Sequence, residues 1–444
     1  MKYLVFTLLF CFSSIFIRAQ VPRSEAEDVH HVMSAAYWKM WNDTLQKAID
    51  HGIEQYRKTT ASIDLPDVKP GTAIQVKQLT HSFLFGGNIF LYGQLATPAM
   101  NSKYEHTFGT LFNAATIPFY WKTLEPEQGK PRFEAGSSYV YRRPPTDPIV
   151  DFCNQKGIMT KGHALVYGLR LHGHPTWMPD DRNIMDSLFC RHIRQLAQRY
   201  GDRIKLWDVV NEPIDQANRG LMPDDYTFKC FQWARRFFPS SVQLNINDVD
   251  LHSPIELHRR YAELTRNLLS RGTKIDHIGI EMHIFDPLEA SDIAKGKDPY
   301  ISPALLKAKL DCLRATDLPI HISEVTVCAP DTTAHGKLIQ AVIARNLYRL
   351  WFSYPTVEAI TWWNVVDGGG ASGEPSYSGI YDKAMNEKPA YAVLDGLINK
   401  EWKTSFVTRL NKNRQLTFRG FRGKYLLAWK DRHGKLQKRT IIVE

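Results

Sequence analysis

The 444-residue sequence is poor in cysteine, and its apolar runs are short apart from one at the N-terminus. It has six cysteines and no CxxC pair, which argues against both a metal cluster and a disulfide framework. The formal charge is +10, but 56 basic residues are scattered among 46 acidic ones and form no basic stripe. We therefore expect neither a nucleic-acid partner nor a membrane span in the mature chain.

The N-terminal segment has the pattern of a secretory signal peptide. Lys2 precedes an apolar run from Leu4 to Ile17, and Arg18-Ala19-Gln20 follows. The run is shorter than a membrane span, and the chain turns polar directly after it. An N-terminal anchor helix is the competing interpretation. We expect residues 1–20 to be removed and the mature protein to be secreted or periplasmic.

Eight β-branched or aromatic runs alternate with longer segments of helical period between residues 81 and 400. The runs are Phe83–Phe90, Phe112–Trp121, Ile158–Tyr167, Ile204–Asn211, Ser241–Asp248, Ile275–Ile284, Pro319–Val327 and Val357–Asp367. Such alternation predicts a parallel sheet, and eight units match a (β/α)₈ TIM barrel, whose usual size is roughly 250 residues. A doubly wound open sheet competes, but no GxGxxG motif opens the first unit.

The two ends of the chain have a different pattern. A helix is predicted over residues 42–58, followed by strands over 61–65 and 73–80. Short strands separated by turn residues fill 401–444. Neither end can bury a sheet face alone, so we expect residues 21–80 and 401–444 to form one small β-sandwich beside the barrel. Two unrelated extensions are the alternative.

Two carboxylates stand on predicted barrel strands, where a TIM barrel places its chemistry at the carboxyl ends. Glu212 ends the fourth strand in the run Trp207–Pro213, and Glu324 lies inside the apolar seventh strand. A carboxylate on an apolar strand is costly to bury and usually has a function. Two carboxyl groups across a barrel mouth suit glycoside hydrolysis. An ion pair between Glu324 and a buried Lys or Arg is the structural alternative.

Residues 81–400 resemble glycoside hydrolase family 10, the retaining β-1,4-xylanases. Trp207–Glu212 resembles the acid/base motif of that family, and Ile322–Val325 resembles its nucleophile motif. Supporting matches are Lys161-Gly162-His163, Asn247-Asp248, His283, Trp363, Leu124–Gly129 and Lys388–Tyr391. The resemblance therefore covers most of the predicted barrel.

The resemblance implies a secreted retaining enzyme that cleaves a β-linked plant polysaccharide, most simply a xylan-type β-1,4-glycan, without a cofactor. It makes Glu212 the general acid/base and Glu324 the nucleophile. The same resemblance implies that Asn211 binds the 2-hydroxyl of the sugar and that His283 is hydrogen-bonded to Glu324. It also implies that His163 contacts a sugar hydroxyl and that Trp363 forms the floor beneath the sugar.

The sequence also departs from the family pattern. Glu281 stands where Gln is usual, on the same strand face as His283, and a third carboxylate would raise the pKa of Glu212. A pairing of Glu281 with an Arg is the alternative. The sugar-binding positions differ as well: Thr116–Lys122 is short and aromatic, Tyr167-Gly168 replaces Trp-His, Gly368–Gly370 replaces a second aromatic residue, and Thr326 replaces Asp.

These departures leave the substrate open. An exo-acting or small-conjugate β-glycosidase competes with an endo-acting xylanase. A carbohydrate-binding pseudoenzyme is the non-enzymatic alternative. We expect a monomer that binds a polysaccharide or oligosaccharide. The exact sugar, the linkage and the role of the terminal sandwich are not determined by the sequence.

Overall fold

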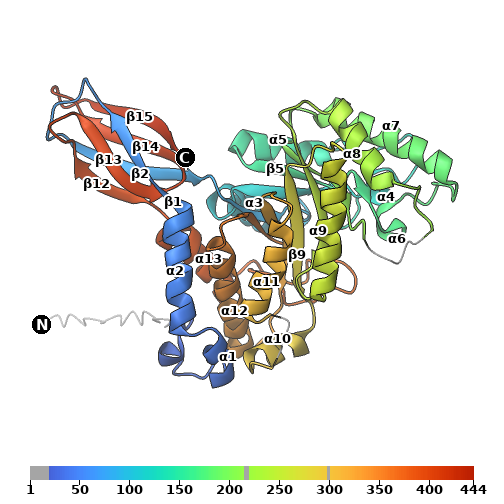
Figure 1. Cartoon of the computed structure of the whole chain (residues 1–444), viewed down its shortest axis with the longest axis horizontal. Coiled ribbons are helices and arrows are strands. Elements are labelled where there is room, and N and C mark those ends of the chain that lie inside the picture. Colours follow the sequence, from blue (N-terminus) through green and yellow to red (C-terminus); the bar gives the residue numbers. More distant parts are fainter. Residues whose placement is uncertain (1–19, 215–219, 298–300) are drawn as a thin grey trace, which may run out of the picture.

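The computed structural model describes residues 20–214, 220–297 and 301–444. The predicted signal peptide, apart from Gln20, lies outside the described residues. Figure 1 shows two parts: a small β-sheet unit at one end, and a larger body in which helices surround a sheet. Among the described residues, no helix has both the length and the apolar character needed to cross a membrane.

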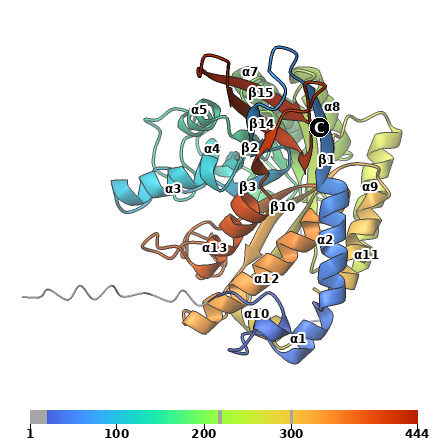
Figure 2. The same cartoon turned by 90° about the vertical axis from the view of Figure 1, so that its left-hand side faces the viewer.

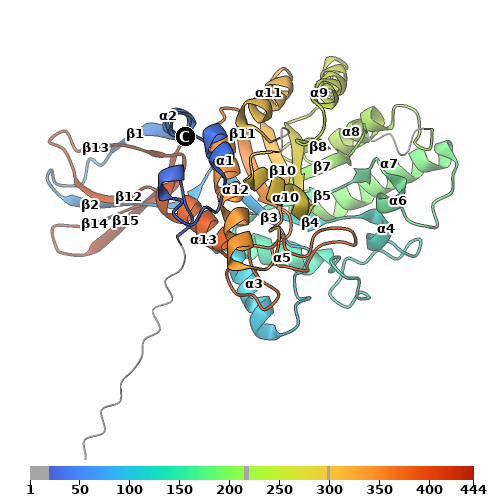
Figure 3. The same ribbon diagram turned by 90° about the horizontal axis from the view of Figure 1, so that it is seen from below.

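The larger body is a closed parallel barrel. Its strands are β3 (Leu84–Asn88), β4 (Ala114–Pro118), β5 (Met159–His163), β7 (Leu206–Asn211), β8 (Gln243–Asp250), β9 (His277–Ile284), β10 (Ile320–Val327) and β11 (Val357–Trp362). Each pairs with the next, β11 pairs with β3, and the short β6 (Val166–Tyr167) extends the edge between β5 and β7. The predicted (β/α)₈ barrel is confirmed, and Figure 3 shows the strands with helices around them.

The barrel strands form because they are apolar on both faces, as a sheet covered by helices requires. All eight residues of β10 are buried. The main outer helices are α3 (Pro98–Thr110), α5 (Thr146–Lys156), α7 (Arg182–Tyr200), α8 (Tyr226–Phe237), α9 (Ile255–Ser270), α11 (Pro303–Arg314), α12 (Ala334–Phe352) and α13 (Pro389–Asp395). Side-chain caps start several of them: Asp181 accepts from Asn183 and Ile184 at the start of α7.

The remaining helices occupy the connections and the N-terminal segment. They are α1 (Ala35–Met40), α2 (Asp43–Arg57), α4 (Trp121–Leu124), α6 (Arg170–Gly173) and α10 (Pro287–Ala294), with single helical turns at Glu25–Glu27 and Gly396–Glu401. Of these, α2 is the helix expected over residues 42–58. It runs from α1 to the sheet unit along the side of the barrel (Figure 1).

The two chain ends pair with each other in the smaller unit. β1 (Lys58–Asp64) pairs with β13 (Gln415–Phe421), and a second sheet has the order β12 (Ser405–Arg409), β2 (Ala73–His81), β14 (Gly423–Lys430), β15 (Leu436–Val443). Both sheets are antiparallel. They enclose a core of their own that includes Ile74, Val76, Phe418, Tyr425 and Leu427. The predicted sandwich from both ends is confirmed, and Figure 2 shows β1, β2, β14 and β15 together above the barrel.

The sandwich meets the barrel at the amino ends of the strands. Trp402 stacks on Phe85 of β3 and on Phe352 of α12, with ring centroids 5.7 and 4.1 Å apart. The Arg57 guanidinium donates to the carbonyl oxygens of Phe352, at 2.5 Å, and Tyr354. Phe352 and Tyr354 precede β11. The sandwich therefore lies away from the carboxyl ends of the strands.

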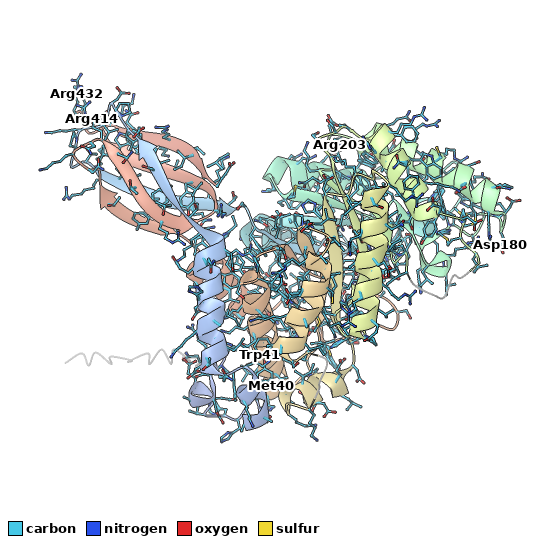
Figure 4. All side chains as sticks on the ribbon, viewed as in Figure 1. Met40, Trp41, Asp180, Arg203, Arg414 and Arg432 are labelled. Atoms are coloured by element: carbon cyan, nitrogen blue, oxygen red, sulfur yellow. The ribbon has the colours of Figure 1, made fainter. Side chains whose placement is uncertain are left out.

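Side chains in Figure 4 mark the extremities of the molecule: Arg414 and Arg432 lie at the outer end of the sandwich, and Asp180 lies at the opposite end, beyond α6. The described cysteines are all free, with Cys153, Cys230 and Cys328 buried. They form no disulfide within the described residues.

Candidate active site

Glu212 lies directly after β7, where the backbone makes a strained turn. Its φ angle is +51°, in the left-handed region that non-glycine residues rarely adopt. Its amide donates to the carbonyl oxygen of Asn247 at 2.7 Å. Gly168 packs against the turn so closely that a β-carbon there would lie 2.1 Å from the carbonyl oxygen of Glu212. The sequence Tyr167-Gly168 thus leaves room for the turn that presents the Glu212 carboxyl.

The Glu212 carboxyl is in an environment that favours its neutral form. The Tyr167 hydroxyl donates to Oε1 at 2.6 Å, and the Asn211 amide donates to the same oxygen at 3.4 Å. Burial and the neighbouring Glu281 carboxylate raise the pKa of Glu212 well above its ordinary value, although the Tyr167 hydrogen bond acts in the opposite direction. This environment therefore favours the protonated form of the Glu212 carboxyl over the ionised form.

Glu324 lies on β10 and is 6% exposed. The amide of Asn247 donates to its Oε1 at 3.2 Å. Nε2 of His163 lies 3.7 Å from Oε1, and Nε2 of His283 lies 3.5 Å from Oε2. Within the described ranges no Lys or Arg pairs with Glu324. The alternative of an ion pair between Glu324 and a buried Lys or Arg is therefore not observed there.

Asn247 of β8 links the two carboxyl-bearing segments. Its Nδ2 donates to Oδ1 of Asn211 at 2.7 Å, to Oε1 of Glu281 at 2.9 Å and to Oε1 of Glu324 at 3.2 Å. Its Oδ1 accepts a hydrogen bond from the Ser323 hydroxyl, which fixes the orientation of the amide. Glu212 and Glu324 are thus connected through two amides, Asn211 and Asn247, on adjacent strands.

Glu281 and His283 form a charged pair beside Glu324. The β9–β10 ladder places Glu281 directly opposite Glu324. Burial and the Glu324 carboxylate raise the pKa of Glu281 to about 7. Burial opposes a charge on His283, but the Glu281 and Glu324 carboxylates raise its pKa well above the ordinary value. Nε2 of His283 lies 3.6 Å from Oε2 of Glu281. The Thr326 hydroxyl is hydrogen-bonded to Nδ1 of His283 at 2.9 Å and fixes the orientation of the ring.

His163 is fixed from behind by a buried carboxylate. Its Nδ1 donates to Asp208 at 2.7 Å, and Asp208 also pairs with Lys161 at 3.0 Å. Burial opposes the charge on Asp208, but Lys161 and the His163 hydrogen bond keep its pKa below the ordinary value. Nε2 of His163 is buried, has no hydrogen-bond partner in the structure and lies next to Glu324. It is therefore available to a hydroxyl of a bound sugar.

Several aromatic rings lie at the carboxyl end of the barrel, beside the carboxyl groups. The Trp363 ring lies 5.4 Å from the His163 ring and 6.4 Å from the His283 ring. Tyr120, after β4, lies 5.3 Å from the His163 ring and 5.9 Å from the Tyr167 ring. Flat apolar faces of this kind stack on sugar rings.

A pocket of about 370 Å³ opens on the other side of Glu212. Its lining residues are Glu212, Ile214, Asp248, Val249, Asp250, Ser253, Leu257 and Glu281. The volume suits a bound sugar. Because Glu212 lies at its wall, a group in the pocket can receive the Glu212 proton.

The structure brings all eight predicted site residues into one connected cluster: Asn211, Glu212, His163, Tyr167, Glu281, His283, Glu324 and Trp363. Their roles in a reaction stay predictions. Sequence reasoning assigned no role to Asn247, Asp208 or Ser323, although all three lie in motifs that it quoted. A polar residue inside a buried strand was the available signal, since such a side chain needs a partner.

Two groups of side chains in the described part of the chain offer three donor atoms within 4.8 Å of one another. One is Glu281, His283 and Glu324, and the other is His277, His321 and Glu358. In the first, Nε2 of His283 lies 3.6 and 3.5 Å from the carboxyl oxygens of Glu281 and Glu324, and these carboxylates raise the pKa of His283. In the second, the two imidazole rings stack with centroids 4.2 Å apart, and burial lowers the pKa of His277 to about 4.

A parallel barrel that holds an acidic carboxyl and a second carboxylate at its carboxyl end has the architecture of a glycoside hydrolase. Residues 82–396 match the family model described as "Glycosyl hydrolase family 10". The match spans well over half of the chain. The chain therefore belongs to glycoside hydrolase family 10.

Individual relatives are distant. The chain is 25% identical over 299 residues to "Endo-1,4-beta-xylanase B" of Thermotoga neapolitana, covering 64% of this chain and 79% of the relative. It is 30% identical over 194 residues to "Beta-1,4-xylanase" of Dictyoglomus thermophilum, covering 40% of this chain and 50% of the relative. The crystal structure of xylanase 10B from Thermotoga petrophila RKU-1 in complex with xylobiose superimposes with a TM-score of 0.58 at 21% identity, over 72% of this chain and 95% of that one.

Replacing Glu281 with Gln is expected to shift the pH dependence of the reaction. The substitution removes a negative charge that raises the pKa of Glu212. As the predicted general acid, Glu212 must be protonated, so we expect activity to be lost as the pH rises through that pKa. The high-pH limb of kcat/KM should therefore move about 0.5 to 1 unit lower. Glu263→Gln, on the exposed face of α9, is the matched control and should leave the limb in place. A limb that stays where it is in Glu281→Gln would contradict the assigned influence.

Proposed function

We propose that this protein is a retaining glycosidase that hydrolyses a β-linked plant polysaccharide, of the xylan-type β-1,4 class, by double displacement. The observation that carries the proposal is the unequal environment of two neighbouring carboxyl groups. Burial and Glu281 favour the acid form of Glu212, whereas Glu324 accepts a hydrogen bond from Asn247 and lies 3.5 Å from Nε2 of His283. Retaining hydrolysis requires such a division of roles.

In the first step, the Glu324 carboxylate attacks the anomeric carbon while the bond from that carbon to the glycosidic oxygen breaks. Glu212 transfers its proton to the departing oxygen, which leaves as a neutral hydroxyl. The product is a glycosyl ester on Glu324. His283 and Asn247 hold the Glu324 carboxylate in place before the attack.

In the second step, the ionised Glu212 removes a proton from water. The resulting hydroxide attacks the anomeric carbon, and the Glu324 carboxylate departs, so both residues return to their starting forms. Each displacement inverts the anomeric carbon. The first sugar product therefore keeps the β configuration.

A panel of xylans, other β-linked plant glycans and their oligosaccharides, with product analysis and NMR of the nascent anomer, tests this function. The expected result is hydrolysis of at least one β-1,4-linked xylan-type substrate with an initial β-anomer. An initial α-anomer would overturn the retaining mechanism. Binding of glycans without any turnover, equally in the wild type and in Glu324→Ala, would instead identify a carbohydrate-binding pseudoenzyme.

An exo-acting β-glycosidase is the second candidate, and a contact between two loops favours it. The Tyr141 hydroxyl donates to the carbonyl oxygens of Gly368 and Gly370 at 3.1 and 3.3 Å. The loop after β4 is thereby joined to the loop after β11, beside the sugar-binding aromatics. We infer that a bridge at that position limits the number of sugars that can bind on that side. Release of single sugars from one chain end would support exo action, and a spread of oligosaccharides would support endo action.

We also propose that the protein is exported to the periplasm or the medium, because the first 20 residues have a signal-peptide pattern. N-terminal sequencing of the mature protein from fractionated cells tests this. A start near Val21 in an extracytoplasmic fraction is expected, and an intact Met1 in the cytoplasm would contradict it.

A further inference from the structure

Arg143 lies beside the sugar-binding aromatics, on the loop between α4 and α5. Its guanidinium carbon is 3.7 Å from the centre of the Tyr120 ring and 5.0 Å from that of Phe90. Tyr120 in turn contacts His163 and Tyr167, the partners of Glu324 and Glu212. Arg143 is therefore two ring contacts away from the carboxyl pair.

The neighbouring Arg142 forms an ion pair with a carboxylate, whereas Arg143 does not. Arg142 pairs with Glu374 at 3.0 Å and donates to Asn364 at 3.2 Å, which anchors the loop. Arg143 donates from Nη1 to the carbonyl oxygen of Arg142 at 2.9 Å. Over residues 20–214, 220–297 and 301–444, no carboxylate lies within ion-pair distance of its guanidinium. Burial lowers the pKa of Arg143 to about 10, so the group is a cation at neutral pH.

The opposite side of the site has the opposite charge. The 370 Å³ pocket beyond Glu212 is lined by the acidic residues Asp248, Asp250 and Glu281. Glu212 gives its proton to the leaving group, so that pocket receives the departing part of the substrate. The retained part then lies on the side of Phe90, Tyr120 and Arg143. An anionic group is disfavoured beside the carboxylates of the departing side, whereas the Arg143 guanidinium can pair with one on the retained side.

We propose that Arg143 binds the carboxylate of a uronic acid residue carried by the retained part of the glycan, and that the enzyme prefers acidic glycans for this reason. A guanidinium presents two parallel N–H donors that match a carboxylate. Stacking on Tyr120 holds the plane of the guanidinium fixed and lowers the cost of ordering it. This inference names a substrate class for the proposed hydrolase and rests on that function.

The test compares matched substrates and matched variants. Each uronic-acid-bearing xylo-oligosaccharide is paired with its carboxyl-reduced counterpart, and kcat/KM is measured for both. The wild type should prefer the acidic member by roughly 10- to 100-fold, and the ratio should fall towards one in Arg143→Gln. Arg143→Lys should recover part of the preference, since it keeps the charge but not the two parallel donors. Arg432→Gln, at the outer end of the sandwich (Figure 4), removes an equal charge and should keep the wild-type ratio.

The outcomes separate the two proposals. If the wild type cleaves both members equally, or if Arg143→Gln keeps the wild-type ratio, the inference fails while the hydrolase stands. If the wild type cleaves neither of these nor any other glycan in the panel, the proposed function itself fails. Titration of the inactive Glu324→Ala variant with both oligosaccharides gives a second readout: tighter binding of the acidic member that depends on Arg143 supports the proposal, and equal binding overturns it.

Discussion

Glu324→Ala should lose turnover of every substrate, by roughly 10⁵-fold in kcat. Without the carboxylate no ester can form at the anomeric carbon, so neither natural glycans nor activated aryl glycosides have a route through the covalent intermediate. The side chain is 6% exposed and contacts Asn247, His163 and His283. Removing the carboxylate also leaves the side chains of these three residues facing a small cavity.

Azide distinguishes a lost nucleophile from a misfolded site. In Glu324→Ala, azide can enter the vacated space and attack the anomeric carbon of an activated β-aryl glycoside directly, which gives an α-glycosyl azide. Recovery of turnover with that product, together with a thermal midpoint close to that of the wild type, supports the assignment. Substantial activity of the folded variant without azide would refute the nucleophile role of Glu324.

Glu212→Ala should impair substrates according to their leaving group. Xylan-type glycans release an alkoxide-like oxygen that needs a proton, so their kcat/KM should fall by roughly 10³- to 10⁴-fold. Dinitrophenyl glycosides need no proton in the first step and should lose far less. Steady-state rates with a series of aryl leaving groups, plotted against the leaving-group pKa, measure this difference.

The matched comparison for this variant is Glu281→Gln, which alters a carboxyl in the same cluster without removing the acid. At a pH below the high-pH limb of both proteins, where Glu212 stays protonated, it should affect all leaving groups nearly equally. In Glu212→Ala, azide should intercept the ester on Glu324 and give a β-glycosyl azide, the opposite anomer from that expected with Glu324→Ala. Equal losses on glycans and dinitrophenyl glycosides in Glu212→Ala would count against its role as the acid.

The sequence was sufficient to predict the barrel because local patterns repeat along it. Seven of the eight predicted barrel strands contain an observed one, and β8 extends two residues past the predicted Ser241–Asp248. Fully buried parallel strands are continuous apolar runs that stand out between amphipathic helices. Strand ends were less predictable. The run Val357–Asp367 was predicted as one strand, but β11 ends at Trp362. The apolar character continues past that point because Val365 and Val366 are buried outside the sheet.

The candidate site was predictable only in its residues and not in its contacts. The ladder between β9 and β10 shifts register between Ile322 and Glu324, and this shift sets Glu281 opposite Glu324. A one-residue change of register reverses which side chains face the barrel interior, and no local pattern encodes it. Arg143 was missed for a related reason: it comes from a long connection whose path depends on the contacts of Arg142 with Glu374 and Asn364.

The sandwich can form only after the end of the chain has been synthesised. β2, from residues 73–81, pairs on one side with β12 and on the other with β14, both of which follow residue 404. While the ribosome is still making the barrel, β2 has neither neighbour, and its backbone edges are open to pairing with other chains. The last forty residues therefore act as a late closure that protects the first strands. A product that stops short of them should form a barrel with an adhesive edge and accumulate as aggregates.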